Sequence, residues 1–280
     1  MSVIQGILLG ILQGVAEFLP ISSSGHLAVA QNIFGLDDVP LLFDIFLHLA
    51  TLAAVVIFFR KKIWELLKIF GRWIARRPDP KNQDDANPLT GSDEAGRKTI
   101  MAIIITTAIT GAAGIFSSKL IPELPIKFVC AGFIVTALLL LFSSAMEKKQ
   151  AAENGKKGIS PVQAVIIGVM QGIGTLPGIS RSGSTIAGAL FAGVDRASAG
   201  EFSFIVSIPA ILGAFVLELK DLGAMSETVG AAPIIAGCAA SFAVGYISLT
   251  LLMRMIKKGN LKWFACYLIP AGILGLIFLR

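Results

Sequence analysis

Long apolar runs follow one another along most of the chain, separated by short polar breaks. They cover residues 2–19, 26–35, 42–59, 99–117, 127–146, 160–175, 184–193, 198–218, 231–253 and 262–279. A helix needs about 20 apolar residues to cross a bilayer. Six runs are long enough: 42–59, 99–117, 127–146, 198–218, 231–253 and 262–279. The pattern therefore predicts an all-α polytopic membrane protein.

Two of the runs, 26–35 and 184–193, are too short to span a bilayer. Each follows a break rich in proline, glycine and serine. We therefore favour re-entrant helix hairpins at 2–35 and 160–193 over tilted spanning helices. Backbone at a hairpin tip cannot face lipid, so it must be buried in protein or line a water-filled cavity. We expect a polar cavity inside the membrane at these tips.

The two hairpins resemble each other at an offset of 158 residues. Nine positions are identical in the two copies: Gln5 and Gln163, Gly10 and Gly168, Gln13 and Gln171, Gly14 and Gly172, Ser22 and Ser180, Ser24 and Ser182, Gly25 and Gly183, Gly35 and Gly193, and Asp37 and Asp195. Chance does not give this many matches at one offset. We predict two repeats, 1–146 and 159–280, joined by a linker at 147–158. Each holds one hairpin plus three transmembrane helices, and this odd number of crossings gives the repeats inverted topology.

The distribution of Lys and Arg agrees with this topology, because cytoplasmic loops carry an excess of both. In this topology nineteen of the 24 Lys and Arg lie on the same side of the membrane as a loop at 60–98, and four lie on the opposite side. We therefore predict that 60–98 and the linker are cytoplasmic, that both termini lie outside, and that the hairpins enter from opposite faces. The one basic residue on neither side is Arg181, at the second hairpin tip.

Composition supports the same class. The chain is 55% apolar and 15% charged, and its net charge of +6 follows the membrane topology, so it does not indicate nucleic acid. Cys130, Cys238 and Cys266 stand singly in apolar runs, without metal-ligand or disulfide spacing. No basic region precedes the first run, so we do not expect a removable signal peptide.

The polar residues at the two tips are few, and they differ between the copies. The first tip carries Gln13, Glu17, Ser22, Ser23, Ser24 and His26, and the second carries Ser180, Arg181, Ser182, Ser184 and Thr185. Asp44, His48 and Glu201 follow on the next helices. The first copy thus supplies an acid, a hydroxyl and an imidazole, and the second supplies a cation. Ionisable residues inside a membrane are costly, which points to a functional site.

The combination fits a phosphate ligand. Arg181 has a planar fork suited to phosphate oxygens, and the helix that opens at "SGST" directs its N–H groups to the same place. Ser23 is the candidate nucleophile, and His26, three residues on, could meet it at a tight tip as its base.

Structural alternatives stay open for each of these residues. Arg181 could pair with Glu17 or Glu201 to hold the hairpins together. The serines at both tips could cap helices. The Asp44–His48 pair, four residues apart, could stabilise its own helix.

The sequence resembles the undecaprenyl-diphosphate phosphatase (bacitracin-resistance) family of membrane enzymes over essentially the whole chain. This resemblance rests on two motifs. One is an (E/Q)xxxE element that runs into a Ser-rich loop and a His, here Gln13–Glu17 and "FLPISSSGH". The other is PGxSRSxxT, here "PGISRSGST" from Pro177 to Thr185, and "EFSF" at 201–204 is also similar. The family dephosphorylates C55-polyprenyl diphosphate to the monophosphate, which recycles the lipid carrier of cell-wall polysaccharide synthesis.

The resemblance implies a set of roles. Glu17, Ser23, His26 and Arg181 would form the catalytic core, with direct attack by His26 as the main variant. The expected substrate-binding residues are Gln13, Ser22, Ser24, Ser180, Ser182, Thr185 and Glu201. A divalent cation, Mg²⁺ or Ca²⁺, would bind at Glu17, which is the one carboxylate of the first motif because Gln13 stands at its first position.

The expected setting is the inner (plasma) membrane, with the active site open to the outer (periplasmic or extracellular) face. The expected partners are a polyprenyl diphosphate and membrane lipids, and no nucleic acid, with a homodimer left open. The alternative function is a transporter or flippase of a phosphorylated lipid, because inverted repeats with broken helices are typical of transporters.

Overall fold

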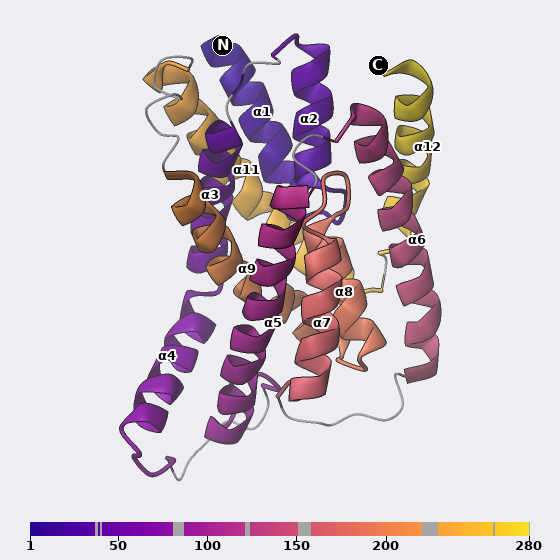
Figure 1. Cartoon of the computed structure of the whole chain (residues 1–280). Coiled ribbons are helices and arrows are strands. Elements are labelled where there is room, and N and C mark those ends of the chain that lie inside the picture. Colours follow the sequence, from indigo (N-terminus) through magenta and orange to yellow (C-terminus); the bar gives the residue numbers. More distant parts are fainter. Residues whose placement is uncertain are drawn as a thin grey trace.

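The computed structural model describes residues 1–36, 39, 41–80, 87–120, 124–150, 158–219, 229–259 and 261–279. In this part of the chain all regular structure is helical and no strand occurs (Figure 1). The helices are α1 (Val3–Ala16), α2 (Ser23–Ile33), α3 (Leu41–Phe58), α4 (Arg60–Ile74), α5 (Asp93–Leu120), α6 (Ile126–Gln150), α7 (Pro161–Ile173), α8 (Arg181–Phe191), α9 (Arg196–Glu218), α11 (Ala231–Lys257) and α12 (Trp263–Phe278). The predicted all-α fold is confirmed.

Five of the described helices are long and apolar enough to cross a membrane: α3, α5, α6, α9 and α11. They correspond to five of the six runs expected to span. The sixth run forms α12, whose 16 residues extend about 24 Å, whereas the hydrocarbon core is about 30 Å thick. The protein is therefore a polytopic membrane protein, and the crossing expected at α12 stays a prediction.

The segment 60–98, for which we predict a cytoplasmic loop, contains two helical stretches in its described part, and its cytoplasmic location stays a prediction. α4 fills Arg60–Ile74, and α5 already begins at Asp93. The apolar residues of α4 recur at helical spacing among many charged ones, so the segment is too polar to register as a span. It forms an amphipathic helix beside the membrane-spanning ones.

The two predicted hairpins are the pairs α1–α2 and α7–α8. α2 and α8 have 11 residues each, or about 16 Å, which is too short to span. Figure 1 shows α1 and α2 in one half of the molecule and α7 and α8 in the other, with their breaks at mid-height. The hairpins thus approach each other from opposite ends.

Matching positions of the repeat build the same local structure in both hairpins. α1 and α7 each begin with a capping box, formed by Ser2 with Gln5 and by Ser160 with Gln163. Both second helices have a serine N-cap, whose hydroxyl accepts a backbone N–H three residues on, and both are followed by a glycine with positive φ. These residues are Ser22 and Ser180, and Gly35 and Gly193. The repeated residues are therefore those that start and stop the helices.

The helices pack across the two halves in reciprocal pairs. α1 packs on α11, and α7 packs on α5, while α6 packs on α12 and α3 on α9. The α1–α11 contact is backbone to backbone at its closest point, since a Cβ on Gly10 would lie 2.2 Å from the carbonyl oxygen of Gly237. Small residues allow this approach in membrane helices. Two equivalent halves would pair in this way, and the inverted repeats stay a prediction.

Candidate active site

The carboxylate of Glu17 lies at the centre of a buried polar cluster between the two hairpins. Glu17 caps the C-terminal end of α1, where its backbone N–H donates to the carbonyl oxygen of Gln13 at 2.9 Å. Gln13 is fully buried, and Glu17 is 5% exposed. The ring of the next residue, Phe18, packs 5.7 Å from that of Phe204 on α9. Glu17 is therefore positioned by the end of α1 and by this aromatic contact.

Four side chains from four helices contact this carboxylate. Gln13 Nε2 donates to Oε2 at 3.0 Å, and Ser23 Oγ donates to the same oxygen at 2.6 Å. His48 Nε2 lies 3.3 Å from Oε2, and Arg181 Nη2 forms an ion pair with Oε1. We call these five residues the Glu17 cluster. It joins α1, α2 and α3 of the first half to α8 of the second.

Arg181 is the first residue of α8, directly after its N-cap Ser180. Of the two acids considered as its partner, the structure selects Glu17, because Glu201 pairs instead with Lys62 of α4. Arg181 Nη1 is buried and has no hydrogen-bond partner among the described residues. A buried donor without an acceptor is costly. The free nitrogen therefore suits a site that receives an anion.

His48 belongs to the cluster although no motif pointed to it. Its Nδ1 lies 2.7 Å from the backbone oxygen of Asp44, which can only accept, so Nδ1 carries a proton. Nε2 then forms an ion pair with Glu17 only when it is protonated as well. Asp44 Oδ1 in turn accepts from Gln31 Nε2 at 2.8 Å. The sequence signal was the four-residue spacing of Asp44 and His48, but it could not show that the imidazole reaches Glu17.

Ser23 and His26 have different partners, which corrects the expectation that they meet. Both lie in the first turn of α2, where Ser23 points to Glu17. His26 Nδ1 lies 2.8 Å from the backbone oxygen of Ser22, and Nε2 lies 2.8 Å from the hydroxyl of Tyr267 on α12. The carboxylate, not the imidazole of His26, is thus the base in contact with Ser23. A catalytic role of His26 stays a prediction.

Most of the other hydroxyls at the tips have internal partners. Ser22 and Ser180 cap their helices, which confirms the structural alternative for these two. Ser182 Oγ lies 3.4 Å from the backbone oxygen of Glu17, and Thr185 donates to the backbone oxygen of Arg181 at 2.6 Å. Ser24 is exposed, and Ser184 Oγ is buried without a partner in the described part of the chain. Phosphate binding by Ser22, Ser24, Ser180, Ser182 and Thr185 stays a prediction.

The donor set around Glu17 does not fit a divalent cation in this arrangement. Both carboxylate oxygens already face donors, one of which is the permanently charged Arg181. The described residues contain no group of three or more His, Cys, Asp or Glu side chains that could hold a metal. Gln13 Oε1 is the one buried oxygen of the cluster without a hydrogen-bond partner there. The cation implied by the resemblance stays a prediction.

The fold and this cluster define a class: a polytopic membrane protein whose broken helices bring an acid, a hydroxyl and a guanidinium together. The chain matches the bacitracin resistance protein BacA family over residues 6–274, and it belongs to this family. It is 47% identical to an undecaprenyl-diphosphatase of Treponema denticola, over 98% of this chain and 96% of the relative. Relatives with the same name in Desulfosudis oleivorans and Borrelia recurrentis are 38% and 35% identical, over at least 97% of both chains. The family predicted from the two motifs is confirmed.

Proposed function

We propose that this protein is an integral-membrane phosphatase that hydrolyses polyprenyl (undecaprenyl) diphosphate to the monophosphate and inorganic phosphate. The names of its relatives support this activity, which recycles the lipid carrier for cell-wall polysaccharide synthesis. The observation that carries the proposal is the Glu17 cluster. It holds a serine hydroxyl against a carboxylate, beside a guanidinium that has one unpaired buried nitrogen.

In this proposal Ser23 is the nucleophile and Glu17 is its base. Ser23 Oγ attacks the terminal phosphorus and passes its proton to Glu17 Oε2, which is 2.6 Å away. The bond from this phosphorus to the bridging oxygen breaks, and the polyprenyl monophosphate leaves. Water then hydrolyses the phosphoserine and releases inorganic phosphate. Direct attack by His26 is the main variant.

Arg181 exchanges one partner for another during this reaction. A carboxylate and a phosphate present similar oxygens to a guanidinium. When the terminal phosphate binds, Arg181 moves from Glu17 to the phosphate oxygens and stabilises their charge in the transition state. The exchange also frees Glu17 to accept the proton of Ser23. An arginine in this role contributes about 10³- to 10⁵-fold to kcat in phosphoryl transfer.

Phosphate release from undecaprenyl diphosphate by the purified protein in detergent tests the proposal. Ser23→Ala and Arg181→Ala should each lower kcat by about 10³-fold or more. Ser144→Ala is the matched control, because the Ser144 hydroxyl bonds to its own helix, and it should keep normal turnover. A phosphoenzyme trapped on Ser23 supports the serine mechanism, and one trapped on His26 supports the variant. Near-normal turnover of both the Ser23 and Arg181 variants would rule out this site.

A transporter or flippase of a phosphorylated lipid is the second candidate, favoured by the two hairpins that meet between the halves. Detergent abolishes the two compartments that transport needs. Hydrolysis in detergent therefore supports the enzyme, and a folded but inert protein supports transport.

The same proposal places the protein in the inner (plasma) membrane, with the active site open to the outer face, on the strength of the Lys and Arg distribution. A cysteine introduced at Ser2 in a cysteine-free variant should react with a membrane-impermeant reagent added to intact cells.

Chelators test whether turnover depends on Mg²⁺ or Ca²⁺. Light scattering tests the homodimer.

A further inference from the structure

Helix α4 has three distinct faces. Leu66 and Ile69 are buried against the rest of the protein, where Ile69 fills the space left by Gly96 of α5. A charged face carries Lys61, Lys68 and Arg72, which lie within an arc of about 40° on a helix of 3.6 residues per turn. Between them is an apolar face that remains exposed, formed by Trp64, Leu67, Phe70 and Ile74. An amphipathic helix of this kind is typical of a membrane interface.

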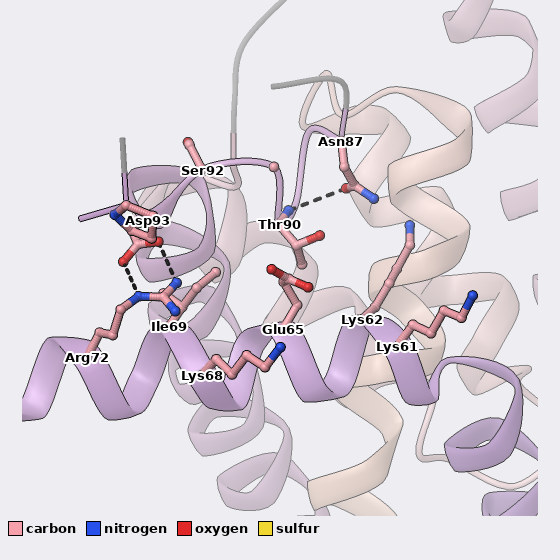
Figure 2. Close-up of a pocket in the computed structure, with 12 residues that line it drawn as sticks. Lys61, Lys62, Glu65, Lys68, Ile69, Arg72, Asn87, Thr90, Ser92 and Asp93 are labelled. Atoms are coloured by element: carbon pink, nitrogen blue, oxygen red, sulfur yellow. Dashed lines mark hydrogen bonds and ion pairs between the residues drawn. The ribbon is translucent and has the colours of Figure 1, made fainter. Parts of the chain in front are cut away.

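The charged face of α4 forms one wall of a cavity of about 520 Å³. Figure 2 shows the cavity between α4 and the segment that leads into α5. On the second wall, Ser92 accepts the backbone N–H of Ala95, and Asn87 Oδ1 accepts those of Leu89 and Thr90. The Asn87 amide nitrogen is therefore left to donate. The lining residues are Lys61, Lys62, Glu65, Lys68, Ile69, Arg72, Pro80, Asn87, Thr90, Gly91, Ser92 and Asp93.

Two of the four basic side chains in this lining hold the helix in place. Arg72 makes a two-pronged contact with Asp93, with Nε 2.9 Å from Oδ2 and Nη2 2.6 Å from Oδ1, as drawn in Figure 2. Lys62 pairs with Glu201 of α9. These two ion pairs fix α4 to α5 and to α9, so the walls of the cavity are anchored independently of any ligand.

The other two, Lys61 and Lys68, are exposed and make no ion pair with any described residue. Besides Asp93, which pairs with Arg72, the only carboxylate among the described lining residues is Glu65. Over residues 60–77 the chain has seven Lys and Arg against a single acid. Among the described lining residues the four basic side chains outnumber the two acids, Glu65 and Asp93, so the described walls of the cavity carry an excess of positive charge.

We propose that this cavity binds the headgroup of an anionic phospholipid. Lys61 and Lys68 bind the phosphate, and the acyl chains lie along the apolar face of Trp64, Leu67 and Phe70. The two faces adjoin, because Lys68 Nζ lies 5.9 Å from the centre of the Trp64 ring. Lys and Arg clusters on amphipathic helices attract anionic lipids in this way, and Trp is favoured at the headgroup level.

The adjoining apolar face is what selects a lipid over free phosphate. A soluble anion would need only the charged wall, whereas a lipid uses both faces of α4 at once. α4 lies at the end of the molecule that is away from the N-terminus (Figure 1). The Lys and Arg distribution predicts that this end is cytoplasmic. The proposal does not rest on the proposed enzymatic activity, because binding is measured without any polyprenyl diphosphate.

Quenching of Trp64 fluorescence by brominated lipids tests this site. A variant with Trp73→Phe and Trp263→Phe leaves Trp64 as the only tryptophan. It is reconstituted in phosphatidylcholine nanodiscs that contain increasing fractions of dibrominated phosphatidylglycerol or dibrominated phosphatidylcholine. The phosphatidylglycerol should quench at a much lower mole fraction. Lys61→Gln/Lys68→Gln should weaken this preference roughly fivefold for each lysine, or about 25-fold in all.

The matched control is Arg76→Gln/Arg77→Gln, which removes the same charge next to α4 but outside the cavity lining. It should change the preference far less than Lys61→Gln/Lys68→Gln does, because Arg76 and Arg77 do not line the cavity that holds the headgroup in this proposal. Lys61→Arg/Lys68→Arg keeps the charge and should keep the preference. An equal loss in both glutamine variants would mean diffuse surface attraction and would overturn the proposal. So would an unchanged preference in Lys61→Gln/Lys68→Gln, or displacement of the lipid by excess inorganic phosphate.

Discussion

Arg181→Ala should destabilise the protein as well as inactivate it, because the change leaves the carboxylate of Glu17 buried without its permanent counter-ion. Breaking a buried ion pair by removing one partner costs about 3–5 kcal/mol. The Arg181 side chain is 17% exposed, and Glu17 keeps its contacts with Gln13, Ser23 and His48. We therefore expect the lower end, about 3 kcal/mol. At about 2–4 °C per kcal/mol for large domains, this corresponds to a fall in Tm of roughly 6–12 °C.

A second substitution separates the structural effect from the catalytic one. Glu17→Gln in the Arg181→Ala background removes the uncompensated charge, so the double variant should recover most of the lost Tm and none of the activity. Both quantities are measured on the same detergent preparations, by thermal unfolding and by phosphate release. Arg254→Ala, which removes an exposed arginine at the end of α11, is the control and should leave both unchanged. A normal Tm for Arg181→Ala, or no recovery in the double variant, would refute the reasoning.

Two further predictions concern the close packing of α1 on α11 and the contact of His48 with Glu17. Gly10→Ala should destabilise the protein by about 1–3 kcal/mol or more, because the new Cβ would lie 2.2 Å from the backbone oxygen of Gly237. Gly168→Ala, at the matching repeat position, should lower the stability less, because its new Cβ would meet a side-chain atom, Ile109 Cβ, at 3.0 Å. Thermal unfolding of both variants measures the two losses of stability, and equal losses would contradict this packing. We expect the contact of His48 Nε2 with Glu17 to hold the carboxylate in place for Ser23. His48→Gln, whose amide can donate to Glu17 as a protonated Nε2 does, should therefore keep more phosphate release than His48→Phe, and identical losses would argue against this role.

The membrane architecture was largely predictable from the chain, because apolar length and helix signals are local properties. The runs that form α3, α5, α6, α9 and α11 were each long enough to require a span. The breaks that separate α1 from α2 and α7 from α8 were visible from their Pro, Gly and Ser content. α4 was missed for a related reason, since its apolar residues are dispersed among charged ones and do not form a run.

The candidate site was predictable only in part. The divergence between the two hairpin copies identified Glu17, Ser23 and Arg181, because identical copies would not place an acid against a cation. The sequence also suggested His26 as the base of Ser23, since only three residues separate them. α2 begins at Ser23, and its first turn directs Ser23 to Glu17 and His26 to Tyr267. Side-chain direction in that turn depends on where the helix begins, which spacing alone does not show.

The sequence by itself determined the class of protein, the positions of the helix breaks and the residue types at the hairpin tips. These follow from hydrophobic length, from caps and from the cost of charge in a membrane, all of which act within about 20 residues. The tertiary structure decided which side chains share the carboxylate of Glu17. His48 comes from α3 and Arg181 from α8, 164 positions from Glu17. Only the packing of the two hairpins and α3 brings these charges within contact, and no local pattern encodes that distance.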